Sequence, residues 1–345
     1  MSSGRFTIGV DLGGTNLRIA AYAEESGLLE TILLSTRLRD GRDAVAADMC
    51  QGIRRLLDRY ARAGSCAGIG IGSPGPLELP AGRLREPPNL PGWDGFELRA
   101  TIEGALGMAV EIENDANAAA LGECVLGTGK TRGIDSLCML TLGTGVGGGI
   151  ILNGKIWHGM VGMAGEAGHV NIWTDGAPCG CGGRGCLEAY ASATAIRRMT
   201  LEMIARENAP LLAALGESNP HFTSRDVAEL AESGDPHAKR IFDDVGRALG
   251  IGLASLVNML NLPLYVLGGG VAKAWTLLCR PLFEELRRRS YVYRLTDPGE
   301  DRAAETKPRK TYVVLAELGS DAGLLGACLL PFANLSGETG GDRAD

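Results

Sequence analysis

The most specific chemical pattern in this chain is a group of three cysteines that follows a histidine. Cys179, Cys181 and Cys186 lie within eight residues, and His169 stands ten residues before the first of them. Three thiolates and one imidazole complete the tetrahedral ligand set of a structural Zn²⁺ site. Three unrelated buried thiols are the alternative interpretation. The C-x-C spacing is tighter than in nucleic-acid-binding fingers, and no basic pattern accompanies it, so we expect a closed structural zinc site.

The loops that this Zn²⁺ would hold also carry carboxylates that suit a sugar. Glu166 precedes His169, and Glu188 follows the last cysteine by two residues. Carboxylates and amides hydrogen-bond to hydroxyl groups, so these two residues form a candidate sugar-binding set with Asn89 and Asn114. A surface or helix-terminal charge is the other interpretation of Glu188. We interpret the remaining histidines as surface or packing residues: His158, His221 and His237.

The segment 113–123, ENDANAAALGE, offers a candidate general base. Asn114 and Asp115 stand where a predicted strand gives way to a predicted Ala-rich helix. Both residue types are favoured helix N-caps, so capping alone explains the segment. A carboxylate at a strand end is also suited to take the proton of a hydroxyl nucleophile. Asp115 is therefore the hypothetical base, with capping as the alternative.

Two glycine-rich turns, each after an apolar strand, could bind phosphates. They are DLGGTN at 11–16 and LGTGVGGG at 142–149. Backbone N–H groups converge in such turns, and glycine allows close approach. Either turn alone is also explained as a hairpin, and neither is followed by the Lys-Ser/Thr of a Walker sequence. The duplication favours phosphate binding. The candidate phosphate ligands are Gly13, Gly14, Thr15, Asn16, Thr144 and Gly145, and Asp11 is the candidate ligand of Mg²⁺, directly or through water.

The elements that must position these residues follow a repeated α/β pattern. Residues 6–35 predict an antiparallel meander of three strands, 42–63 a helix and 67–72 a strand. The strand–turn–strand pattern returns at 137–152, and its LGTG begins 130 residues after LGGT. Further helices are predicted at 96–106, 115–126, 187–205, 225–233, 236–260, 272–289 and 321–332, and further strands at 109–113, 263–270 and 311–318.

These halves predict two α/β domains with a cleft between them. We expect a smaller domain at 1–116, joined by a C-terminal helix at 321–335, and a larger one at 117–320 that carries the zinc site. The charged, apolar-poor segment 296–310 is predicted to be a mobile loop.

The length, composition and charge of the chain limit the classes of function that it can have. The 345 residues allow two domains, and 45% hydrophobic content gives each a core. The net charge of −7 argues against a nucleic-acid partner. No apolar stretch approaches the roughly 20 residues that cross a bilayer, and the first residues lack a basic and apolar leader, so we expect a cytoplasmic protein with no membrane partner. Six scattered cysteines out of nine suit buried thiols in a reducing compartment.

Taken in order, the motifs resemble the ROK family of sugar kinases and repressors, which has the actin-like (ribonuclease H-like) fold. The resemblance covers nearly the whole chain through DLGGTN, SPGP, NLPGW, ENDANAAALGE, LGTGVGGG, GEAGH, CGCGGRGCLE, LGGG and DAGLLGA. It implies a kinase that uses ATP and Mg²⁺, has Asp115 as its base, and is commonly a homodimer. The sugar ligands that it implies are Asn89, Asn114, Asp115, Glu166, His169 and Glu188. Gly268, Gly269 and Gly270 would form part of the adenosine pocket.

The polar set resembles that of the family's glucokinases, so we expect phosphorylation of the 6-hydroxyl of glucose to give glucose 6-phosphate. Kinases for N-acetylglucosamine, N-acetylmannosamine or fructose, and polyphosphate as the donor, remain alternatives. A repressor of the same family would need a DNA-binding module before Asp11, where ten residues stand. A chaperone or cytoskeletal ATPase would leave the sugar and zinc motifs unexplained. The segment 296–310 is longer than the family pattern predicts.

Overall fold

The protein is described by a computed structural model that covers residues 4–62, 64–299 and 306–335. Its internal contacts divide the chain into two compact units. The first comprises Met1–Thr131, Gly149–Gly165 and Ser320–Asp345, and the second Arg132–Gly148 and Glu166–Gly319. These units place 117–131 and 149–165 with the N-terminal segment. The domain boundary after residue 116 stays a prediction.

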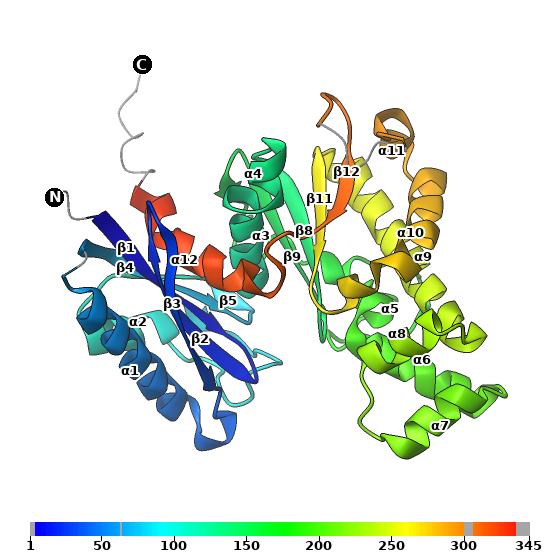
Figure 1. Cartoon of the computed structure of the whole chain (residues 1–345), viewed down its shortest axis with the longest axis horizontal. Helices are drawn as coiled ribbons and strands as arrows, with labels where there is room; N and C mark the ends of the chain where they lie inside the picture. The colour runs from blue at the N-terminus through cyan, green and yellow to red at the C-terminus, as the bar shows by residue number, and fades with distance from the viewer. Residues whose placement is uncertain (1–3, 63, 300–305, 336–345) are drawn as a thin grey trace. The chain divides into compact units, whose positions relative to one another are not determined.

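The first unit contains a five-stranded sheet in the order β3-β2-β1-β4-β7. The meander is confirmed, because β1 (Gly4–Leu12), β2 (Asn16–Ala23) and β3 (Gly27–Ser35) pair antiparallel. The strands β4 (Gly64–Ser73) and β7 (Val110–Asn114) extend the sheet in parallel with β1. The parallel strands therefore end at one edge of the sheet (Figure 1).

Alternation along β1 and β4 explains which helix covers which face. Every second residue of β1 from Phe6 to Leu12 is a buried apolar side chain in the core that includes α1 (Arg42–Tyr60) and α2 (Leu98–Leu106). The intervening positions face α12 (Ala322–Leu335). A Cβ added to Gly70 would lie 1.9 Å from the carbonyl oxygen of Ala327. The glycines of AGIGIG thus permit α12 to approach the sheet.

The second sheet repeats the first. Its order is β10-β9-β8-β11-β12, the same relative order as in the first sheet. The strands are β8 (Leu137–Leu142), β9 (Val146–Leu152), β10 (Lys155–Ile156), β11 (Leu264–Gly268) and β12 (Tyr312–Leu315). β11 pairs in parallel with both β8 and β12. The duplication predicted from the two glycine turns is confirmed.

The second unit also contains most of the helices. They are α5 (Glu188–Ala191), α6 (Ala193–Arg206), α7 (Pro210–Ser218), α8 (Ser224–Glu232), α9 (Pro236–Leu260), α10 (Trp275–Arg289) and α11 (Tyr291–Thr296). The helix predicted at 187–205 is two helices, because Ser192 is extended and its side chain caps Ala195 N–H of α6 at 3.0 Å. Sequence periodicity missed α7 and α11, as well as α4 (Thr128–Arg132), β5 (Leu77–Glu78) and β6 (Arg83–Leu84).

The polar segment 296–310 begins at the end of α11 and leads toward β12. Thr311 N–H donates to the carbonyl of Thr296 at 2.9 Å, and Arg287 Nε donates to Asp297 at 2.6 Å. The two ends of the segment are therefore joined. The prediction of mobility falls partly on residues 300–305, which lie outside the described residues. Among the helices in the described part of the chain, none has the length and apolar character needed to cross a bilayer.

Candidate functional site

The edge of the first sheet gathers three of the predicted residues. In the parallel strands, Asp11 of β1 is opposite Gly72 of β4, and Ser73 of β4 is opposite Asn114 of β7. Neighbouring strands lie about 4.8 Å apart, so the backbones of Asp11 and Asn114 are separated by about 10 Å. Asp115 follows directly at the same edge. The tertiary structure thus brings the candidate metal ligand and the candidate base to one edge of one sheet.

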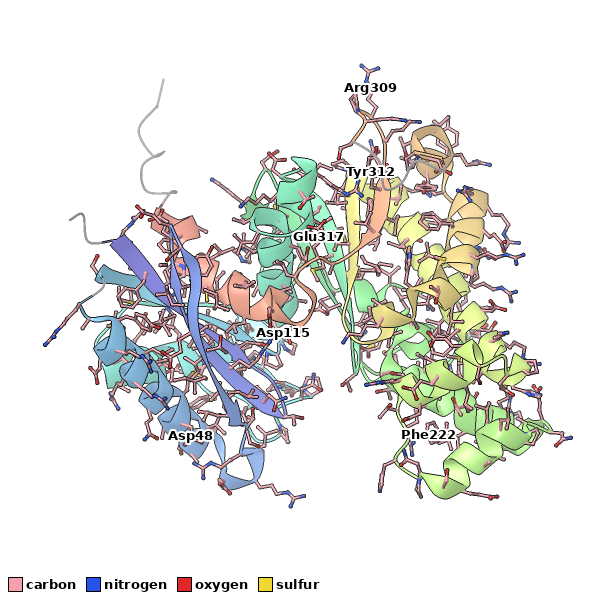
Figure 2. All side chains as sticks on the ribbon, viewed as in Figure 1. Asp48, Asp115, Phe222, Arg309, Tyr312 and Glu317 are labelled. Atoms are coloured by element: carbon pink, nitrogen blue, oxygen red, sulfur yellow. The ribbon has the colours of Figure 1, made fainter. Side chains whose placement is uncertain are left out.

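The capping role at this edge belongs to Asn114. Its Oδ1 accepts from Ala116 N–H at 2.9 Å and from Asn117 N–H at 3.3 Å. Asp115, labelled in Figure 2, is the first residue of α3 (Asp115–Val125). Its Oδ1 accepts from Ala116 N–H at 2.7 Å. The carboxylate therefore lies at the positive end of the helix dipole. The capping alternative holds for Asn114, while Asp115 is not the N-cap.

The first glycine turn lies beside Asn89. Gly13 N–H donates to the carbonyl of Asn16 at 2.9 Å, which closes the turn between β1 and β2. A Cβ on Gly14 would lie 3.3 Å from the carbonyl oxygen of Asn89. Gly14, Thr15, Asn16 and Asn89 are exposed. The candidate phosphate turn and one candidate sugar ligand are therefore neighbours within the first unit.

Arg18 holds Asp11, and the sequence patterns did not single it out. The two residues are opposite one another in the β1–β2 pair. Nε and Nη2 of Arg18 donate to Oδ2 of Asp11 at 3.0 and 2.6 Å, and Nη1 donates to Asp321 at 2.9 Å. One guanidinium thus serves two carboxylates, so negative charge remains for a divalent cation. Asp11 is thus the residue that would hold Mg²⁺, directly or through water.

His158 is 43% exposed, as the surface interpretation predicts, but it has a buried partner that this interpretation did not include. Its Nε2 lies 2.5 Å from Oε2 of Glu113, the residue that precedes Asn114. Hydrogen bonding to Glu113 raises the pKa of His158, while partial burial acts in the opposite direction. The two residues are 45 positions apart in the chain. No local pattern could have paired them.

The second glycine turn, in the second unit, is held by Glu188. The carboxylate Oε2 of Glu188 accepts from Val146 N–H at 2.9 Å. Thr194 Oγ1 donates to the carbonyl of Thr144 at 2.8 Å, which fixes the other side of the turn. Glu188 is the first residue of α5, so the helix-terminal alternative holds for its position. The contact with Val146 N–H is an additional role.

The glycines at the end of β11 lie against the same turn. Gly268 is opposite Thr141 in the parallel pair of β11 and β8. Gly269 has φ of 88°, and a Cβ there would lie 2.5 Å from the carbonyl oxygen of Leu142. Only glycine fits this approach without strain. The candidate adenosine segment therefore borders the candidate phosphate turn.

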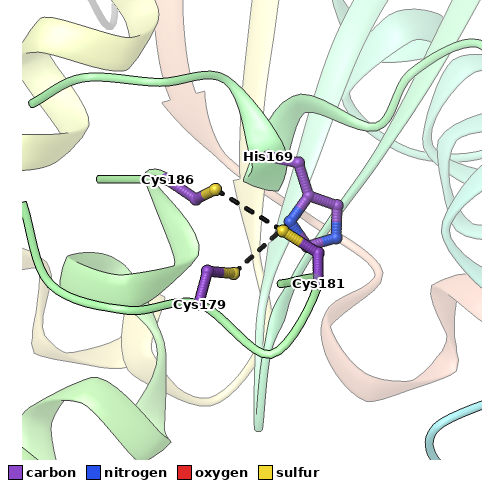
Figure 3. Close-up of side chains that lie close together, drawn as sticks. All are labelled: His169, Cys179, Cys181 and Cys186. Carbon is purple, nitrogen blue, oxygen red and sulfur yellow. Dashed lines mark hydrogen bonds between the residues drawn. The ribbon is translucent and has the colours of Figure 1, made fainter. Parts of the chain in front are cut away.

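The four predicted zinc ligands come together in the second unit. One donor atom from each of His169, Cys179, Cys181 and Cys186 lies within 4.8 Å of every other. The Sγ atoms of Cys181 and Cys186 lie 3.7 Å apart, and Sγ of Cys179 lies 3.6 Å from Nδ1 of His169. Figure 3 shows the four side chains close together. Tetrahedral Zn²⁺ with bonds of about 2.0 to 2.3 Å separates its ligand atoms by about 3.5 to 3.8 Å. The residues therefore fit a tetrahedral metal ion.

The two nitrogens of His169 point to different groups. Nδ1 faces the cysteine sulfurs, while Nε2 lies 3.9 Å from a carboxylate oxygen of Glu166. One ring could therefore bind a metal ion through Nδ1 and a sugar hydroxyl through Nε2. Burial raises the pKa of the Cys179 thiol to about 12, so its thiolate depends on a bound cation.

Comparison with known proteins identifies the family. The sequence pattern of the ROK family matches residues 7–333. The chain belongs to the ROK family. The glucokinase of Halalkalibacterium halodurans is 36% identical to this chain over 326 residues, which cover 94% of each protein.

Solved structures of ROK proteins have the same fold. The ROK hexokinase of Thermus thermophilus is 34% identical, with a TM-score of 0.77 over 96% of this chain and 99% of that one. A ROK family glucokinase from Streptomyces griseus, in complex with glucose and AMPPNP, is 33% identical, with a TM-score of 0.73 over 94% and 98%. The actin-like α/β fold predicted for this ROK chain is confirmed.

Proposed function

We propose that this chain is an ATP-dependent kinase that transfers phosphate to the 6-hydroxyl of glucose. The observation that carries the proposal is the 36% identity with a glucokinase over 94% of the chain. Three local features support it: Asp115 begins α3, Gly13 and Asn16 close the first glycine turn, and Glu188 accepts from Val146 N–H in the second.

The chemistry follows from the residues at the sheet edge. Asp115 takes the proton of the 6-hydroxyl as the hydroxyl oxygen bonds to the γ-phosphorus of ATP. The bond from the γ-phosphorus to the bridging β–γ oxygen breaks, and ADP leaves. The turns Gly13–Asn16 and Thr144–Gly145 bind the phosphates through backbone N–H groups, and Gly268–Gly270 contact the adenosine. Mg²⁺, when bound beside Asp11, neutralises charge on the phosphates.

Each unit, taken by itself, carries candidate sugar ligands. In the first unit they are Asn89, Asn114 and Asp115, and in the second Glu166, His169 and Glu188. Because Oδ1 of Asn114 accepts the capping hydrogen bonds, its Nδ2 would donate to a hydroxyl group of the sugar. A structural Zn²⁺ on His169, Cys179, Cys181 and Cys186 would hold the loops that carry the second group.

Substrate choice tests the proposal. With ATP and Mg²⁺, we expect kcat/KM for glucose to exceed the values for mannose, fructose, N-acetylglucosamine and N-acetylmannosamine. A pocket that hydrogen-bonds a hydroxyl discriminates strongly against sugars that leave its polar groups unpaired. A kcat/KM at least tenfold higher for an N-acetylated sugar would overturn the proposal that glucose is the substrate. It would leave the assignment as a sugar kinase intact. Polyphosphate in place of ATP, measured in the same assay, tests the phosphate donor.

A homodimer in the cytoplasm is the second part of the proposal, and it rests on the resemblance. Apolar side chains exposed on helices of the second unit support it, since Met259, Tyr291 and Leu295 are 81%, 67% and 65% exposed. We expect light scattering at micromolar concentration to give about twice the chain mass of 36.1 kDa. A particle of one chain mass would contradict the dimer.

A further inference from the structure

Glu113 is a deeply buried carboxylate whose partner is His158. The Glu113 side chain is 4% exposed, against 43% for His158, and Oε2 lies 2.5 Å from Nε2 of the imidazole. A carboxylate in such a place is costly unless hydrogen bonds or an opposite charge compensate it. His158 supplies that compensation from a segment far away in the sequence.

The second oxygen of Glu113 connects this pair to the proposed base. Oε1 accepts from the backbone N–H of Asn114 at 2.8 Å and from Nδ2 of Asn117 at 3.0 Å. Asn114 in turn caps α3 through its side chain. One carboxylate thus fixes the residue before Asp115 and the first turn of the helix that Asp115 begins.

The backbone around His158 is held as well. Trp157 N–H donates to the carbonyl of Ile150 at 2.8 Å, and Ala164 N–H donates to the carbonyl of His158 at 3.2 Å. These bonds close the chain on both sides of residue 158. The imidazole therefore reaches Glu113 from a tethered position, as a supporting residue must.

We propose that His158 and Glu113 are positioning residues that hold Asn114 and Asp115 in the geometry for sugar binding and proton transfer. The inference rests on the proposed function, since Asp115 is the group positioned. Misplacement of a reacting group by about 1 Å can lower a rate by about 100-fold. The pair would thus affect turnover without touching the sugar.

The pair also predicts a pH dependence. Among the residues that the structure describes, Glu113 is the charged group that shifts the pKa of His158, and the shift is upward. Because the pKa of His158 is raised, the stabilisation that its protonated ring gives the folded protein is complete below the ordinary pKa of about 6.5. That stabilisation is lost as the pH rises through the raised pKa. We expect kcat/KM to fall on this alkaline side as the imidazolium is lost.

An NMR titration tests the pair without reference to catalysis. In the full chain, the imidazole of His158 should titrate above the ordinary histidine value of about 6.5, and Glu113→Gln should lower its pKa. Glu111→Gln, on the same strand, is the matched control and should leave the titration unchanged. A His158 titration that Glu113→Gln does not move would overturn the pair. Because no activity is measured, this result stands even if glucose is not the substrate.

Kinetics then test positioning. We expect His158→Gln, which keeps an N–H donor but cannot become charged, to lower kcat for glucose by about tenfold or more and to remove the alkaline fall. The KM for ATP should change less than about twofold, and His221→Gln should change nothing. Unaltered kcat and an unaltered pH profile in folded His158→Gln would overturn the role, as would a lower melting temperature with full kcat. A wild-type protein without sugar kinase activity would instead overturn the proposed function.

Discussion

Asp115→Asn should lower kcat for glucose by at least about 100-fold, the range expected when a general base is removed. The amide cannot take the proton of the 6-hydroxyl at neutral pH. Its oxygen can still accept the hydrogen bond from Ala116 N–H, which is 2.7 Å long in the carboxylate form. Asn114 continues to cap α3. The melting temperature and the affinity for glucose should therefore stay close to those of the wild type.

Asp58→Asn is the matched control, because this aspartate is exposed on α1 and lies in none of the candidate motifs. It removes the same charge from the chain and should leave kcat unchanged. Steady-state assays with glucose and ATP, together with calorimetric glucose binding, separate turnover from affinity. Turnover near the wild-type value in Asp115→Asn would show that another group is the base.

Removal of the metal should have the second largest effect. We expect one Zn²⁺ per chain by elemental analysis. Cys181→Ser should lower glucose affinity by at least about tenfold, since the loops with Glu166 and Glu188 lose their common support. The geometry carries this expectation, because the sulfurs of Cys181 and Cys186 already lie 3.7 Å apart. Zinc uptake by metal-free protein should release protons, because the buried Cys179 thiol must ionise.

Cys279→Ser controls for the loss of a thiol, since Cys279 lies in α10 and outside the cluster. It should keep both the metal and the glucose affinity. Fully active protein that contains no zinc would contradict the structural site. Glucose affinity that is unaltered in Cys181→Ser would contradict its role in the sugar loops, even if the metal were present.

The sequence alone determined features that depend on neighbours in the chain. The zinc ligands lie within 18 residues, from His169 to Cys186, so their spacing was sufficient to predict the cluster. The two glycine turns needed only a strand on each side, and their duplication predicted two similar halves. The structure then showed that the two sheets share one strand order. Long helices such as α9 were predicted because 25 residues repeat their apolar positions many times. Short elements such as α11 offered too few residues for periodicity.

The tertiary structure decided which distant polar groups meet. Glu188 reaches Val146 N–H across 42 positions, Glu113 reaches His158 across 45, and Arg18 reaches Asp321 across 303. A charged residue has no periodic pattern that names its partner. A buried charged group is stable only with a hydrogen-bonding or oppositely charged partner, and the tertiary fold determines which group is close enough to be that partner. The sequence therefore supplied the candidate base and ligands, while the fold supplied the groups that hold them in place.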